Sequence, residues 1–209
     1  QLIASVQSYN DLGVKFDSAL SFKDHISCLV AKAQRRIGLL FRCFLTRDVD
    51  VLMKAYTTYV RPVVEYASNV WSPGQVTLID KIESVQRRFT KRLPGLHDLS
   101  YKERLSKLRI DSLELRRLKS DLVLTYKIIF GLIDVDSNNY FSLRCESSTR
   151  GHSYKLLTEN CVIDRRKNFF SQRVAKVWNS MPSSIVKFHS VSGFKASMER
   201  LNLKIFTRN

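Results

Sequence analysis

The segment VQRRFTKRLPG, residues 85–95, places four cations and two large apolar residues in one helical length. Apolar residues recur before it at steps of three and four, which is the period of one helix face. A buried stripe backed by cations suits a helix that packs on a core and grips a phosphate backbone. The alternative is a solvated basic face without a ligand. The stripe is Leu78, Ile79, Ile82, Val85, Phe89 and Leu93, and the cationic row is Lys81, Arg88 and Arg92.

The composition indicates a folded basic surface. The 209 residues are 44% hydrophobic, enough for one large domain or two small ones. A net charge of +16 comes from 35 lysines and arginines against 19 acidic residues. Most of the excess follows residue 80 and alternates with apolar residues, so polyanions are the natural partner.

The cysteines indicate a reduced protein, and the apolar residues form no run that would span a membrane. Cys28, Cys43, Cys145 and Cys161 lie too far apart for a zinc knuckle, and four cysteines are too few for a disulfide scaffold in a chain of this length. We expect Cys28 and Cys43 to be core thiols of an amphipathic helix. There is no signal peptide and no membrane-spanning apolar run. The first residue, Gln1, indicates a piece of a longer protein or a processed product.

The first half of the chain predicts a short β segment followed by helices. Residues 1–17 resemble the end of a sheet, in which Leu12, Val14 and Phe16 alternate. Ser21 is the expected N-cap of a long helix. The apolar stripe of that helix is Ile26, Leu29, Val30, Ala33, Ile37, Leu40, Phe41 and Phe44.

A second helix is predicted from Asp50 through Val60, with Pro62 as a kink or restart. The sequence SPG at 72–74 marks a break, and the basic helix follows until Pro94.

Capping boxes predict two further helices, beginning at Ser100 and Asp111, the longer ending near Gly131. Residues 134–153 are expected to form a loop, and 154–163 an extended segment or hairpin.

Two short helices complete the chain. Pro182 closes the first, which carries Trp178, and Ser190 or Ser192 begins the second.

No catalytic constellation is present in the sequence. There is no glycine-rich phosphate loop and no carboxylate pair suited to two Mg²⁺ ions. Cys145, His152 and Cys161 match no zinc module, and we expect surface or capping roles for the histidines. The sequence therefore predicts no catalytic residue, no metal and no cofactor. The histidines are His25, His97, His152 and His189.

Aromatic residues beside cations could stack on bases if they are exposed, although helical spacing is also typical of a core. They are Tyr56, Tyr59, Tyr66, Trp71, Phe169, Phe170 and Trp178.

Seven ordered motifs, taken together, carry a resemblance that covers nearly the whole chain. They resemble the C-terminal part of the reverse transcriptase of non-LTR retrotransposons of the jockey and chicken-repeat type. The motifs are DLGV (11–14) with LSF (20–22) and HI (25–26); YVRPVVEYAS (59–68) with VWSP (70–73); IESVQRRFTK (82–91); SY (100–101) with ERL (103–105); SLE (112–114) with RR (116–117); TRGH (149–152); and WNSMP (178–182).

The resemblance implies the end of a palm-like sheet in residues 1–19, a thumb-like helical region in 20–131 and a C-terminal extension in 132–209. The thumb would hold an RNA template and a DNA primer, beside the missing palm and fingers of the same polyprotein. The polymerase aspartates would precede this chain, so the chain alone is not expected to be an enzyme. Such a protein would work inside the cell, in the nucleus or the cytoplasm, without a membrane.

We therefore predict a mainly α fold: a helical thumb-like bundle with a short β segment at its start and a small helical C-terminal extension. Phosphate contacts are expected from arginines and a lysine of the first and the basic helices. Two further arginines are second choices, because they could instead pair with Glu114 and Asp121. The first group is Arg35, Arg36, Arg87, Arg88, Lys91 and Arg92, and the second is Arg116 and Arg117.

Two other functions fit the sequence. The basic helix could dock an acidic protein partner, with Arg61, Glu65 and Trp71 in structural roles. Alternatively, the chain is a partial mobile-element copy with no independent function, although its intact helical patterns argue against heavy decay.

Overall fold

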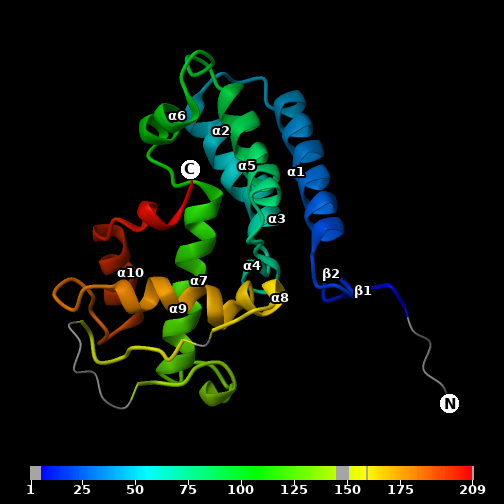
Figure 1. Ribbon diagram of the computed structural model, residues 1–209. Helices are drawn as coiled ribbons and strands as arrows, with labels where there is room; N and C mark the ends of the chain where they lie inside the picture. Colours follow the sequence, from blue (N-terminus) through cyan, green and yellow to red (C-terminus); the bar gives the residue numbers. More distant parts are fainter. Residues whose placement is uncertain (1–5, 145–150, 159, 209) are drawn as a thin grey trace. The chain divides into compact units, whose positions relative to one another are not determined.

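The computed structural model describes residues 6–144, 151–158 and 160–208, and it is mainly helical, which confirms the predicted fold class (Figure 1). The chain forms two compact units, unit 1 (Gln1–Glu114) and unit 2 (Leu115–Asn209). The division falls inside helix α7 (Leu113–Ile129), not at the 131/132 boundary drawn between thumb and extension. The functional names of these regions stay predictions.

Unit 1 begins with a hairpin. Strands β1 (Ser8–Asp11) and β2 (Val14–Asp17) pair antiparallel. Leu12 and Gly13 form the two-residue turn at φ values of 45° and 83°, and the Tyr66 hydroxyl donates to the Leu12 carbonyl at 2.9 Å. Leu12 is 85% exposed and Val14 is buried. The predicted alternation therefore begins at Val14, because Leu12 belongs to the turn.

Asp17, rather than Ser21, organises the start of helix α1 (Lys23–Cys43). Its carboxylate accepts from the backbone N–H groups of Ser21 at 3.1 Å and Phe22 at 2.8 Å. Burial raises the pKa of Asp17, but these donors outweigh burial and the pKa is lowered. Phe22 occupies the N-cap position in the left-handed region, without a side-chain cap, so the predicted Ser21 cap is wrong.

A π-helix separates the next two helices. Asp48 caps α2 (Val49–Ala55), η1 (Tyr56–Val60) follows, and α3 (Arg61–Glu65) carries Pro62 in its first turn. Pro62 has no N–H to donate to an α-helical ladder, and the wider turn ahead of it accommodates that loss. The predicted restart at Pro62 is confirmed. Helix α4 (Ser68–Trp71) comes next.

Helix α5 (Val76–Lys91) supplies the centre of the unit 1 core. All six residues of the predicted stripe are buried, from 8% exposed at Leu78 to 0% at Phe89. The Phe89 ring stacks on Tyr56, with centroids 4.2 Å apart. The apolar period of the sequence therefore located both the helix and its buried face.

A carboxylate from α5 caps the start of α7. Glu83 is fully buried and accepts from the N–H groups of Leu113 at 3.0 Å and Glu114 at 3.2 Å, and from the Tyr101 hydroxyl. Helix α6 (Tyr101–Leu108), which precedes α7 in the chain, begins with the predicted capping box at Ser100.

Unit 2 packs α7, from Leu115 onward, with α9 (Phe170–Ser180) and α10 (Val191–Arg200) around an aromatic core. Trp178 and Phe194 are fully buried in it. The predicted ends are confirmed: Ser190 caps α10, and α9 closes before Pro182. The remaining pieces are η2 (Ser137–Asn139), α8 (Asp164–Lys167), η3 (Leu203–Phe206) and one antiparallel bridge, Leu143 to Leu156, where an extended segment or hairpin was expected.

Candidate nucleic-acid interface

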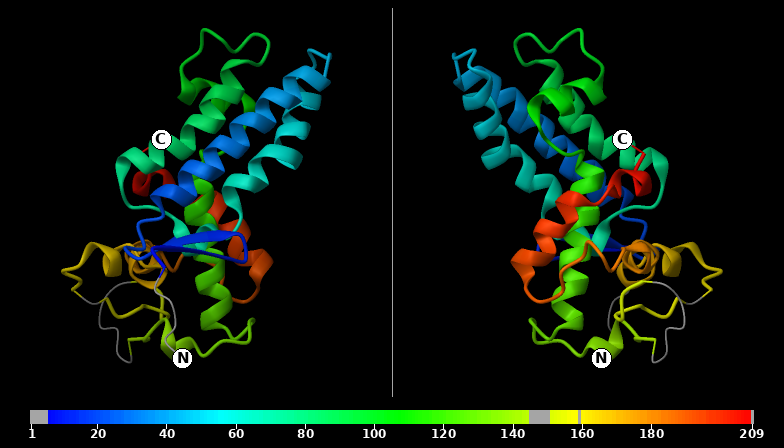
Figure 2. Two further views of the ribbon diagram at one scale, coloured as in Figure 1. Left: turned by 90° about the vertical axis from the view of Figure 1, so that its right-hand side faces the viewer. Right: turned by 90° about the vertical axis from the view of Figure 1, so that its left-hand side faces the viewer.

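Helices α1 and α5 of unit 1 lie side by side and run in the same direction (Figure 2). Near their starts, Lys81 Nζ donates to Ser27 Oγ at 2.7 Å. Near their ends, the Arg92 guanidinium lies over the Phe41 ring, 4.1 Å from its centroid. These contacts, together with the shared core, hold the two helices in one alignment.

Four predicted phosphate ligands are exposed on these helices: Arg35 from α1, and Arg88, Lys91 and Arg92 from α5 and its C-cap. Arg42 of α1 is also exposed, and its Nε donates to the Gly38 carbonyl at 3.3 Å. Helical spacing turns these side chains away from the buried stripes. We call Arg35, Arg42, Arg88, Lys91 and Arg92 the α1–α5 basic face.

Two other predicted ligands are engaged on opposite flanks of this helix pair. Arg36 donates to the Tyr59 carbonyl of the π-helix at 2.6 Å. Arg87 pairs with Asp80 at 3.2 Å and lies 5.3 Å from the Tyr101 ring centroid. Arg36 and Arg87 are therefore held by contacts with other residues of unit 1, and we leave both out of the α1–α5 basic face.

The second-choice arginines belong to α7 in unit 2. Arg117 is only 3% exposed and Arg116 is half-buried. Asp121, one of the two acidic residues considered as partners of these arginines, forms a two-bond ion pair with Arg173, at 2.9 and 3.0 Å. A phosphate outside the protein cannot reach Arg117 in this position, so we remove it from the candidate ligands.

Most of the predicted stacking aromatics are core residues. Tyr56, Trp71 and Trp178 are fully buried, and Phe170 is 6% exposed. The exposed ones are Tyr59, Tyr66 and Phe169.

Two histidines are buried, against the expectation of surface or capping roles. Lys15 N–H donates to His25 Nδ1 at 3.2 Å, and His152 Nε2 lies 2.9 Å from the Trp178 carbonyl. Each ring meets a tryptophan, His25 on Trp71 and His152 on Trp178. Burial lowers the pKa of both histidines, so both are neutral at physiological pH.

The cysteine prediction is also wrong, because Cys28 and Cys43 are exposed. Cys145, and residues 149 and 150 of the TRGH motif, lie outside the described residues. Across the part of the chain that the structure describes, no group of His, Cys, Asp and Glu side chains could hold a metal ion.

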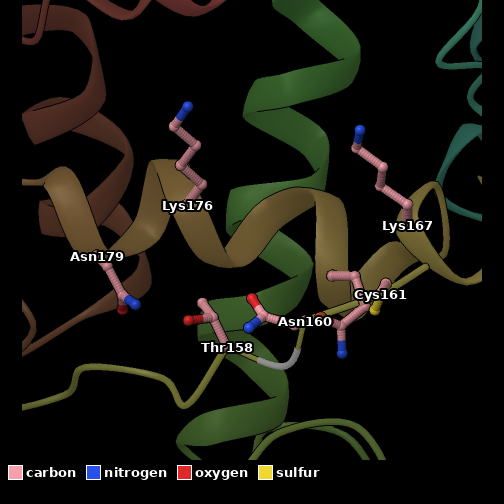
Figure 3. Close-up of a pocket in the computed structure, with 7 residues that line it drawn as sticks. Thr158, Asn160, Cys161, Lys167, Lys176 and Asn179 are labelled. Atoms are coloured by element: carbon pink, nitrogen blue, oxygen red, sulfur yellow. The ribbon is translucent and has the colours of Figure 1, made fainter.

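A pocket of about 510 Å³ lies in unit 2, beside α9 (Figure 3). Lys167 and Lys176 extend away from Thr158 and Asn160, and the Asn179 amide holds the backbone of Leu156 through two hydrogen bonds. Most of the side chains that line the pocket are amides and amines. The lining residues are Thr158, Asn160, Cys161, Lys167, Gln172, Lys176 and Asn179.

A buried polar network backs α5 without offering catalytic chemistry. Gln86 accepts from the Tyr56 hydroxyl and donates to Tyr101, whose own hydroxyl donates to Glu83. Burial, followed by the neighbouring Glu83 charge, raises the pKa of Tyr101, so its hydroxyl stays protonated. Local sequence patterns do not predict this network, since its members come from three segments.

Comparison with known proteins finds one weak relative. An uncharacterized protein of Caenorhabditis elegans, B0403.1, is 28% identical over 125 residues, which cover 58% of this chain and 63% of that protein. The chain thus spans less than two thirds of that relative's length. No family model and no solved structure matches. Every helix in the described ranges is too short or too polar to cross a membrane.

Proposed function

We propose that unit 1 binds nucleic acid through the phosphate backbone, as the thumb of an RNA-directed DNA polymerase of a non-LTR retrotransposon. The α1–α5 basic face would contact an RNA template paired with a DNA primer. The chain carries no catalytic role of its own and would act beside the palm and fingers of the same polyprotein, in the nucleus or the cytoplasm.

The observation that carries the proposal is the α1–α5 basic face itself. Five exposed cations stand on two aligned helices whose opposite faces are anchored in the core. Because helix positions are fixed, ordering the cations costs less than it would on a loop. Contacts of this kind read the shape and charge of a near A-form hybrid rather than its sequence.

The test is a titration of the chain with a fluorescent RNA–DNA hybrid. Four or five phosphate contacts predict an affinity loss of about 150-fold to about 500-fold between about 50 and about 200 mM salt. The double variant Arg88→Glu/Arg92→Glu should bind weakly and lower the salt slope by about 2.

The matched control is Lys102→Glu/Lys107→Glu, which makes the same charge change at exposed positions of α6. It should lose far less affinity. Equal losses of affinity in the two double variants would mean that net charge alone explains the binding. Salt-independent binding would favour the alternative in which the basic helix docks an acidic protein. A primer-extension assay of this chain should show no synthesis.

A further inference from the structure

A second cationic and aromatic surface lies in unit 2, around α8. Arg165, Arg166 and Lys167 are all exposed, and Phe169, two residues on, is 44% exposed. The Arg166 guanidinium lies 5.9 Å from the Phe169 ring centroid. We call these four residues the α8 patch.

Phe169 and Phe170 are adjacent in sequence but differ in exposure. Phe170 is buried and meets Phe141 edge-to-face at 5.6 Å, so it supplies the packing. Phe169 occupies the N-cap position of α9, where its side chain is left partly in solvent. An aromatic face held in place by the helix start, with cations beside it, suits stacking on a base.

We propose that the α8 patch binds single-stranded nucleic acid, with a base stacked on Phe169 and phosphates against the three cations. The side chains of Arg165, Arg166 and Lys167 point about 100° apart, because they are consecutive residues of one helical turn. A straight duplex therefore contacts only some of these three cations. A flexible strand can bend around the turn and reach all three. This inference concerns unit 2 and does not depend on hybrid binding by unit 1.

The neighbouring pocket extends the path of such a strand. Lys167 belongs to the α8 patch and also lines the pocket, and Lys176 continues the cationic side along α9 (Figure 3). Gln172 and Asn160, on the same lining, carry amides that can donate to and accept from a base edge. The pocket volume of about 510 Å³ leaves room for a base.

Val162 and Ile163, just before α8, are 97% and 66% exposed and are the strongest argument for a different ligand, an anionic membrane. The single strand is favoured because the ring beside the cations is aromatic, and because Lys176 continues the positive charge along α9 rather than within one turn.

The experiment titrates the full chain with a fluorescent oligouridylate of about 12 nucleotides, which stays single-stranded. Arg165→Gln/Arg166→Gln/Lys167→Gln should lower affinity at least about tenfold. The control Lys195→Gln/Arg200→Gln/Lys204→Gln removes three exposed cations from the same unit and should change affinity less than about threefold. Equal losses would overturn the site.

Substitutions at Phe169 test base stacking separately from charge, because they leave the net charge unchanged. Phe169→Leu keeps an apolar side chain and should weaken oligouridylate binding about tenfold, whereas Phe169→Tyr should bind as the native chain does. Neither change should affect hybrid binding, and Arg88→Glu/Arg92→Glu should lower oligouridylate affinity less than Arg165→Gln/Arg166→Gln/Lys167→Gln does. Native binding by Phe169→Leu, or loss with the α5 variant instead, would overturn the inference while leaving the unit 1 proposal standing.

Binding to phosphatidylserine vesicles tests the alternative that the α8 patch contacts an anionic membrane. The native chain should bind oligouridylate and not vesicles. Vesicle binding that Val162→Ser/Ile163→Ser abolishes, without oligouridylate binding, would assign the α8 patch to a membrane surface and contradict the proposal.

Discussion

Two arginine pairs, Arg87-Arg88 in α5 and Arg116-Arg117 in α7, look alike in sequence and differ in structure. In α5 the second arginine is exposed and the first is paired with Asp80. In α7 the second arginine is buried, with only 3% of its surface exposed. A basic dipeptide on a helix therefore becomes a candidate ligand only on the side that no neighbour covers.

The largest expected effect comes from reversing charge at matched positions of the two pairs. Arg117→Glu would place a carboxylate in a buried site one helical turn from Asp121, and should lower the free energy of unfolding by about 3 kcal/mol or more. Arg88→Glu should change it by less than about 0.5 kcal/mol. Urea unfolding followed by circular dichroism measures the free energy of unfolding of both variants. Equal losses would contradict the difference between the two arginine pairs.

The sequence predicted α5 and the caps at Ser100 and Ser190 well, but it missed the start of α1, for a physical reason. Six apolar residues with one period define a helix face wherever the chain folds, so the α5 stripe was found in full. The start of α1 depends on Asp17, which lies outside the helix and accepts from the N–H groups of Ser21 and Phe22. Local patterns cannot rank Asp17 against Ser21.

The candidate site was predicted only in part. Arg35, Arg88, Lys91 and Arg92 were correctly placed on exposed helix faces, because they lie off the apolar stripes. For Arg117 the sequence left two roles open, a phosphate contact or a pair inside the fold, because helical spacing alone does not show what covers a side chain. The Glu83 cap was missed, because the N–H groups that it accepts from lie 30 and 31 residues away.

A smaller effect is expected at the junction where α5 meets α7. Glu83→Gln keeps the size of the side chain but loses the charge that accepts from two N–H groups and a hydroxyl, and should cost about 2 kcal/mol. Single-tryptophan variants that keep Trp71 or Trp178 would report on unit 1 and unit 2 separately.

The control is Glu103→Gln, at the exposed capping box of α6, which should cost less than about 1 kcal/mol. A Glu83→Gln chain as stable as this control would show that the buried carboxylate contributes nothing beyond a neutral amide.

The smallest effect compares the buried histidines of the two units, His25 and His152. Burial lowers the pKa of each in the folded chain, so the unfolded chain binds more protons as the pH falls below about 6.5. Stability should therefore be complete above that pH and decline as the pH drops toward about 5. Unfolding at stepped pH tests this, with His97→Gln as an exposed-site control.

His25→Phe should reduce the acid sensitivity reported by Trp71, and His152→Phe that reported by Trp178. Unchanged pH profiles in both variants would mean that other groups govern the loss.

The most direct test of the central claim is the salt dependence of RNA–DNA hybrid binding by the native chain, by Arg88→Glu/Arg92→Glu and by Lys102→Glu/Lys107→Glu. The α1–α5 basic face predicts a steep slope for the native chain and the α6 double, and a slope lower by about 2 for the α5 double. Identical slopes in the two doubles, with folding intact by circular dichroism, would contradict it.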